Sequence, residues 1–216
     1  MQSTKGGYIV AGKNEFYWRR LHSLLGVIPV GVFLVQHLFI NHFATMGEEA
    51  FNRAAGFVGN LPFVIILEFV VIYIPLLFHA ILGIYIAFTA DNNPVRLSYF
   101  RNWMFTLQRI SGIILLLFIS WHVWETRIQK ALGAEVNFQM MEDILSNPIM
   151  LIIYIIGILS ATFHLSNGLW SFLVRWGITQ SPRSQYISSW VMGIFFVILS
   201  VIGIRAALAF VPGFFS

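Results

Sequence analysis

The stretch that decides the fold is PFVIILEFVVIYIPLLFHAILGIYIAFT, which occupies residues 62–89. Glu68 is its only charged residue. A helix needs about 20 mostly apolar residues to cross the hydrocarbon core of a bilayer. Because this run is longer than that, we expect a membrane-spanning helix that tilts or projects beyond the lipid.

The rest of the chain has the same character. It is 58% hydrophobic and only 10% charged, a balance far from that of a soluble domain. We predict an all-α membrane protein, a single integral membrane domain over residues 1–216 with five transmembrane helices. The first helix is expected to be retained, because it lacks the small-residue cleavage site of a signal peptide. The spans are expected at about 21–43, 62–89, 103–125, 148–174 and 187–212.

The charged residues gather at the ends of the predicted spans and indicate their orientation. One set of ends carries the larger basic group: Lys5, Lys13, Arg19, Arg20, Arg96, Arg101, Arg109, Arg175 and Arg183. The opposite loops hold a mixture that is rich in acids: Arg53, Arg127, Lys130, Glu48, Glu49, Glu125, Glu135, Glu142 and Asp143. The positive-inside rule then places the N-terminus in the cytoplasm and the C-terminus outside. Topology accounts for the basic residues, so no nucleic-acid partner is expected.

Proline and asparagine indicate where two of the spans begin. The tripeptide Ser-Asn-Pro at 146–148 predicts a capped start for the fourth span. The tripeptide Asn-Leu-Pro at 60–62 predicts much the same for the second span. Within the first and second spans, Pro29 and Pro75 are expected to kink the helices.

Four of the six histidines fall one to a span in the first four spans: His37, His79, His122 and His164. Successive spans run in opposite directions, and a helix rises about 1.5 Å per residue, so sequence position gives depth. His37 and His122 then lie about 5 Å from the outer boundary, whereas the other two lie about 25 Å below it. The histidines therefore sort into two pairs, at levels about 20 Å apart along the membrane normal.

Both deeper histidines have the same neighbours, in FHAILG at 78–83 and FHLSNG at 163–168. In each, a glycine follows four residues after the histidine and lies on the same helix face, where a porphyrin edge can approach the backbone. Haem iron with two axial imidazoles needs one histidine from each of two facing helices. We predict a bundle of the first four helices that holds one haem between these histidines. A second haem is predicted between the outer pair, which lacks the glycine.

The predicted ligands indicate the class of chemistry. Two axial imidazoles leave the iron no open position, which favours electron transfer over oxygen chemistry. Haems at two depths form a path across the bilayer, whose outer end needs a lipid-soluble partner such as a quinone. The chain has no cysteine, which excludes the usual thiolates of an iron–sulfur cluster and the thioether bonds of c-type haem. The alternative from another class is a small transporter with an intramembrane histidine relay; a visible spectrum without haem bands would favour it.

Other polar residues in or near the spans have weaker claims. Glu68, about 9 Å below the outer boundary, is a candidate proton carrier beside a quinone, and a hydrogen bond to a neighbouring helix is an equal alternative. His22, at the inner interface, is not an expected ligand. His42 points about 140° away from His37 and is expected at the surface. Candidate partners of the haem propionates are Arg109, Arg127 and Arg175. Ser160 is a candidate to orient a ligand, and close-packing positions are expected at Gly26, Gly31, Gly112 and Gly157.

Three regions resemble one known family: EFYWRRLHSLLGVIPVG at 15–31, RNWMFTLQRISGIILLLFISWHVWETR at 101–127, and HLSNGLWSF, WGIT and SPRSQ within 164–185. They are similar to the cytochrome b558 subunit of Bacillus-type succinate dehydrogenase. The resemblance covers nearly the whole chain and leaves residues 1–13 as a variable polar tail. It implies a five-helix, two-haem, multi-pass anchor in a bacterial cell membrane, with a flavoprotein subunit and an iron–sulfur subunit as partners.

The resemblance also implies the cofactors and the route of the electrons. The family's axial ligands correspond to His37 with His122 for an outer, low-potential haem b, and to His79 with His164 for an inner, high-potential haem b. Electrons from succinate would pass through FAD and iron–sulfur clusters, both in partner subunits, to the inner haem, the outer haem and menaquinone. Proton uptake at the outer side would let the membrane potential assist this weakly driven reaction. The nearest alternative is the equivalent anchor of a menaquinol-oxidising fumarate reductase, which the sequence barely distinguishes.

Overall fold

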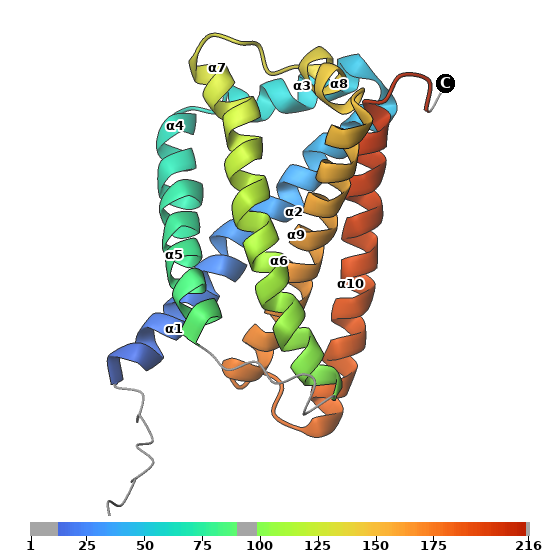
Figure 1. Cartoon of the computed structure of the whole chain (residues 1–216). Coiled ribbons are helices and arrows are strands. Elements are labelled where there is room, and N and C mark those ends of the chain that lie inside the picture. The colour runs from blue at the N-terminus through green and yellow to red at the C-terminus, as the bar shows by residue number, and fades with distance from the viewer. Residues whose placement is uncertain (1–12, 90–98, 215–216) are drawn as a thin grey trace, which may run out of the picture.

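The computed structural model describes residues 13–89 and 99–214, and it shows a bundle of long helical segments (Figure 1). The described residues form helices and turns, with no strand among them. Five helical segments in this part of the chain are long and apolar enough to cross a membrane: Glu15–Met46, Val64–Thr89, Phe100–Ala131, Pro148–Arg175 and Pro182–Ala209. The prediction of an all-α protein with five candidate transmembrane helices is confirmed.

Several of the five segments are divided into shorter elements. The η1 segment is a 3-10 turn, whereas η2 and η3 are π-helical stretches within longer helices. In chain order the elements are α1 (Lys13–Val27), α2 (Pro29–His42), η1 (Phe43–Met46), α3 (Glu48–Gly59), α4 (Val64–Leu67), η2 (Glu68–Tyr73), α5 (Ile74–Thr89), α6 (Phe100–Val123), η3 (Trp124–Ile128), α7 (Gln129–Ala131), α8 (Phe138–Leu145), α9 (Pro148–Arg175) and α10 (Pro182–Ala209).

The first span consists of α1 and α2, which meet at Ile28. Pro29 has no N–H to donate, so the break falls where the sequence predicts a kink. The α1 helix begins at Lys13, before the apolar run that is expected to enter the membrane at about residue 21. Arg19 pairs with Glu15 one turn earlier at 2.7 Å, and such pairs let a helix continue through polar sequence.

The second span begins differently from the prediction. Asn60 does not cap it; its backbone instead closes the C-terminal end of α3. Phe63, in the left-handed region with φ of 57°, comes directly before α4. Pro75 follows the π-helical η2 segment, which suits a residue that cannot donate a backbone hydrogen bond to the preceding turn.

The third span is longer than predicted. It passes the expected end at Glu125 and continues through η3 and α7. Arg127 and Lys130, which the prediction places in a loop, therefore lie on a helix. The π-helical stretch carries this polar extension, so apolar composition alone underestimates the length of the helix.

The fourth and fifth spans have well-defined starts. The Asn147 side chain accepts hydrogen bonds from the backbone N–H groups of Ile149 and Met150, at 2.9 and 3.4 Å, as predicted for α9. Ser181 and Ser184 form a capping box on α10, so this helix begins at Pro182 and not at the predicted residue 187.

Burial differs strongly between the spans. In its most apolar window α9 has 33% of its residues buried, whereas the second span has 6%. The α9 helix packs against α1, α6 and α10, and it is the axis of the bundle. Large apolar side chains on the second span point outward, for example Phe69, Leu77 and Phe88. An outward apolar surface of this kind suits a helix that faces lipid.

The two ends of the bundle differ in composition. The α3, α7 and α8 helices and the C-terminus lie at one end, and the start of α1 and the α9–α10 connection lie at the other (Figure 1). The end that holds the start of α1 carries basic residues, including Arg19, Arg20, Arg175 and Arg183. The other end carries most of the acids, including Glu48, Glu49, Glu135, Glu142 and Asp143, and we call the two the basic end and the acidic end. Lys5 and Arg96 of the predicted basic set, and residues 1–12 of the tail, lie outside the described residues.

Candidate functional site

The four predicted histidines lie in two pairs inside the bundle. His37 on α2 and His122 on α6 have ring centroids 5.9 Å apart, with their planes at 76°. His79 on α5 and His164 on α9 have centroids 6.1 Å apart, with planes at 82°. These are the partners expected from depth. We call them the outer pair and the inner pair.

The spacing within each pair suits a metal ion between the rings. A metal–imidazole bond is about 2 Å long, so two imidazoles on opposite sides of one ion have centroids about 6 Å apart. Over residues 13–89 and 99–214 no group of three or more His, Cys, Asp or Glu side chains gathers as a metal site. Each pair therefore offers the two axial nitrogens that a haem iron takes, and no larger ligand set.

Both inner histidines are held through Nδ1 by neutral acceptors. His79 Nδ1 donates to the His22 carbonyl at 2.9 Å. His164 Nδ1 donates to the Gln108 carbonyl at 3.1 Å, and the Ser111 hydroxyl lies 3.1 Å from the same nitrogen. Since a carbonyl can only accept, Nδ1 must carry the proton in each ring, which leaves the Nε2 lone pair for a metal.

The inner pair is also fixed by close packing. Gly26 lies where a Cβ would collide with the His79 ring, and a Cβ on Gly112 would approach His164 Cε1 to 3.2 Å. These glycines are close-packing positions as predicted, but what packs on them is the ring of a candidate ligand. His22 stacks on His79 with centroids 4.0 Å apart, so it contacts the inner pair although we do not expect it to be a ligand.

The other glycines of the prediction contact side chains from neighbouring helices. A Cβ at Gly31 would lie 2.7 Å from Leu165 and one at Gly157 would lie 2.6 Å from Phe118, which fits their predicted packing role. Gly83 and Gly168 come four residues after the inner histidines, and a Cβ added there would lie 3.3 Å from His22 Nε2 and 3.5 Å from Gln108 Nε2, respectively. Their role beside a porphyrin stays a prediction.

The outer pair has a different environment. His122 Nδ1 lies 3.2 Å from the Tyr154 hydroxyl, which donates to Glu125 Oε2 at 2.9 Å. Phe118 stacks on the His122 ring, with centroids 5.7 Å apart. On His37 the side-chain amide of Asn41 lies 3.4 Å from Nε2, and the ring packs against Phe33 with centroids 5.4 Å apart. The candidate ligand His122 on α6 is thus connected to a carboxylate.

Sequence reasoning missed the residues that hold the Nδ1 atoms. Gln108, Ser111 and Tyr154 are not among the sequence-based candidates, and Glu125 is counted there only among the acidic residues of the opposite loops. One signal was available, because Tyr154 lies six residues after Pro148 and Glu125 three after His122, which puts all of them near one level. Depth alone does not show that they face each other.

Glu68 forms an ion pair with Arg127. Arg127 Nε donates to the two carboxylate oxygens at 3.2 and 3.0 Å, and Nη2 donates to Oε2 at 2.8 Å. The pair joins η2 to η3, and both side chains are partly exposed. The contact corresponds to the neighbouring-helix alternative for Glu68. Arg127, a candidate propionate partner, is engaged by this carboxylate instead.

The remaining four candidates lie on α2, α6 and α9. His42 is half-buried and its Nδ1 donates to the Ile202 carbonyl on α10 at 3.3 Å, so the expected surface position is wrong. The guanidinium of Arg109 lies 4.0 Å from the centre of the Phe105 ring. Arg175 donates to the Arg19 carbonyl at 3.4 Å. Ser160 is buried on α9.

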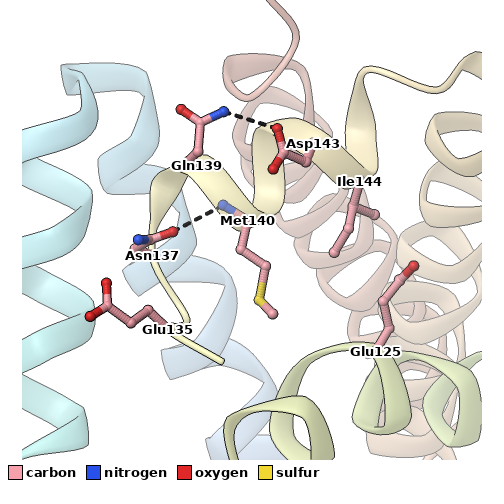
Figure 2. A pocket seen from close by; sticks show the side chains of 7 residues that line it. All are labelled: Glu125, Glu135, Asn137, Gln139, Met140, Asp143 and Ile144. Atoms are coloured by element: carbon pink, nitrogen blue, oxygen red, sulfur yellow. Dashed lines mark hydrogen bonds between the residues drawn. The ribbon is translucent and has the colours of Figure 1, made fainter. Parts of the chain in front are cut away.

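An open pocket of about 390 Å³ lies at the acidic end, and Glu125, which accepts from the Tyr154 hydroxyl, is one of its lining residues. Figure 2 shows its lining, in which Glu125 faces side chains of α8 and of the segment before it. Gln139 donates to Asp143, and the Asn137 side chain caps α8 by accepting from Met140 N–H. Glu125 thus has one side toward this pocket and a hydrogen bond to Tyr154.

A family model and a known relative both match this chain and agree on one family. Residues 89–203 match the model of the succinate dehydrogenase/fumarate reductase transmembrane subunit family. The chain is also 62% identical, over 202 residues, to the succinate dehydrogenase cytochrome b558 subunit of Bacillus subtilis (strain 168). That alignment covers 94% of this chain and 100% of the relative.

Proposed function

Since the chain belongs to the succinate dehydrogenase/fumarate reductase transmembrane subunit family, as a multi-pass cytochrome b subunit, we propose that it passes electrons from an iron–sulfur subunit through two haem b groups to menaquinone. The dicarboxylate chemistry, the FAD and the iron–sulfur clusters then belong to a flavoprotein subunit and an iron–sulfur subunit. Membership of this family implies catalytic partner subunits, and the absence of cysteine agrees with clusters held elsewhere.

One observation carries this proposal: two imidazole pairs, each about as far apart as one iron requires, on four different helices. A bound haem supplies reversible one-electron chemistry at each pair. The protein presents His37 with His122 and His79 with His164. For three of these rings, hydrogen bonds to Nδ1 keep Nε2 available.

We propose that the basic end faces the cytoplasm and receives the partner subunits. The positive-inside rule supports this orientation, since the basic residues of α1, of the start of α6, and of the ends of α9 and α10 at Arg175 and Arg183 lie there. The acidic end then lies outside, near the outer pair. Menaquinone, being soluble in lipid, would be reduced at that level, with Glu68 as the proton carrier and Arg127 as its ionic partner.

Fumarate reductase is the second candidate, because the matching family model includes the transmembrane subunits of both enzymes. The same chain would then take electrons from menaquinol. The 62% identical relative is named as a succinate dehydrogenase subunit, which favours succinate oxidation. Comparison of succinate:menaquinone and menaquinol:fumarate rates in one preparation of the complex would establish the direction.

Single replacement of each paired histidine tests the proposal. In the purified complex, His37→Leu and His122→Leu should each remove the same haem, and His79→Leu and His164→Leu should each remove the other. His42→Leu is the matched control, because His42 lies on α2 but bonds to α10; it should retain both haems. A colourless wild-type complex would favour the transporter alternative, and a His79→Leu complex with both haems would reject the pairing.

A further inference from the structure

The ring of His122 ends a chain of three hydrogen-bonded groups. A carboxylate has no proton to give, so the Tyr154 hydroxyl donates its single proton to Glu125 Oε2 at 2.9 Å. The tyrosine oxygen must then accept from His122 Nδ1, which lies 3.2 Å away. The chain therefore fixes the protonated nitrogen of His122 and links that ring to a negative charge.

In the described part of the chain, neither Nδ1 of the inner pair has such a connection to a charged group. His79 Nδ1 donates to a backbone carbonyl, and so does His164 Nδ1, with the neutral Ser111 hydroxyl beside it. A hydroxyl that donates to a carboxylate is a stronger acceptor than the same hydroxyl alone, because hydrogen bonds in a chain polarise one another, and it passes the influence of the negative charge to the ring. Of the three rings held through Nδ1, His122 is the one that is linked to a negative charge.

The packing keeps this chain in place. Tyr154 is 5% exposed and belongs to a buried apolar cluster with Met141, Leu145 and Phe210. Its ring also meets Phe118 edge-on, with centroids 5.3 Å apart, and Phe118 in turn stacks on His122. Glu125 is half-buried and borders the open pocket of Figure 2, where water can solvate the rest of its carboxylate.

We propose that Tyr154 and Glu125 are positioning residues that polarise His122 and so lower the reduction potential of the outer haem relative to the inner one. This role depends on the haem binding proposed above. A stronger hydrogen bond to Nδ1 makes the imidazole a more basic ligand, which stabilises the oxidised iron. The two sites then differ through the partners of Nδ1, although both use two histidines.

Redox titration of the two haems in the purified complex tests this role. Tyr154→Phe keeps the aromatic ring and removes the acceptor, so the outer midpoint potential should rise while the inner one stays unchanged. Glu125→Gln keeps the tyrosine and removes the charge, so a smaller rise is expected. Tyr186→Phe, an exposed tyrosine on α10, is the control and should shift neither potential.

The outcomes separate this role from haem binding itself. Two bound haems with an unchanged outer potential in Tyr154→Phe would overturn the positioning role and leave the proposed function intact. A wild-type complex without two haems would instead contradict the proposed function. If Tyr154→Phe loses the outer haem, Glu125→Gln decides: a raised outer potential supports the role and an unchanged one overturns it.

Discussion

The inner and outer histidine pairs have nearly the same geometry and quite different surroundings. Their ring centroids are 6.1 and 5.9 Å apart, and their planes cross at 82° and 76°. The inner rings rest on glycines and donate to neutral carbonyls, whereas His122 is connected through Tyr154 to Glu125. Because the two ligand sets are the same, a difference in potential between the sites must come from their surroundings, and the partners of Nδ1 are one such difference.

The largest expected effect separates the two pairs by their order in electron flow. In His164→Leu, succinate should no longer reduce the outer haem and quinone reductase activity should be lost, because the inner site receives the electrons first. In His122→Leu, succinate should still reduce the inner haem. Stopped-flow spectra of both complexes check this. Reduction of the outer haem by succinate in His164→Leu would reverse the proposed order.

A second effect should affect only the inner pair. Gly26→Ala places a methyl group against the His79 ring, and overpacking of this kind typically costs about 1–3 kcal/mol. We expect a reduced content of the inner haem and a normal content of the outer haem, measured from the difference spectrum. Gly193→Ala on α10, where a Cβ would meet nothing within 4 Å, is the control. Equal loss of both haems would show that the two sites are not independent.

A third effect concerns the outer side alone. Glu68→Gln removes the carboxylate that Arg127 binds, so quinone reductase activity should fall several-fold while both haem spectra survive. Glu49→Gln, whose carboxylate forms an exposed pair with Arg53, is a matched control and should retain full activity. Unchanged turnover in Glu68→Gln would reject the proton-carrier role.

The smallest expected effect tests the neutral partners of the inner pair. Ser111→Ala removes a hydroxyl beside His164 Nδ1 but leaves the Gln108 carbonyl as acceptor. The net loss of one neutral hydrogen bond is about 0.5–1.5 kcal/mol, so both haems should remain and only the inner potential should shift slightly. A shift in the outer potential of the same size would contradict the separation of the two environments.

The sequence predicts those features that depend on length and height. Five apolar runs are sufficient to find the spans, and a constant rise per residue is sufficient to match His37 with His122 and His79 with His164 in level. Helix ends were predicted less well, because pairs such as Arg19–Glu15 and the polar π-helical stretch after Val123 extend helices beyond their apolar parts.

Rotation of the helices about their axes could not be predicted. Whether His42 meets α10, or Tyr154 meets His122, depends on which face each helix turns inward, and depth carries no information on this. The partners of Nδ1 on the inner rings include backbone carbonyls, which have no signature in a sequence. For the same reason the sequence leaves undecided whether Glu68 bonds to a neighbouring helix, since Arg127, its partner in the structure, lies on a separate span.

Redox titration of the α bands of the wild-type complex tests the central claim most directly. Two histidine pairs in different environments predict two haems b per chain that titrate as two one-electron steps at separate potentials. A single step, one haem per chain or the absence of any reducible haem band would contradict the account.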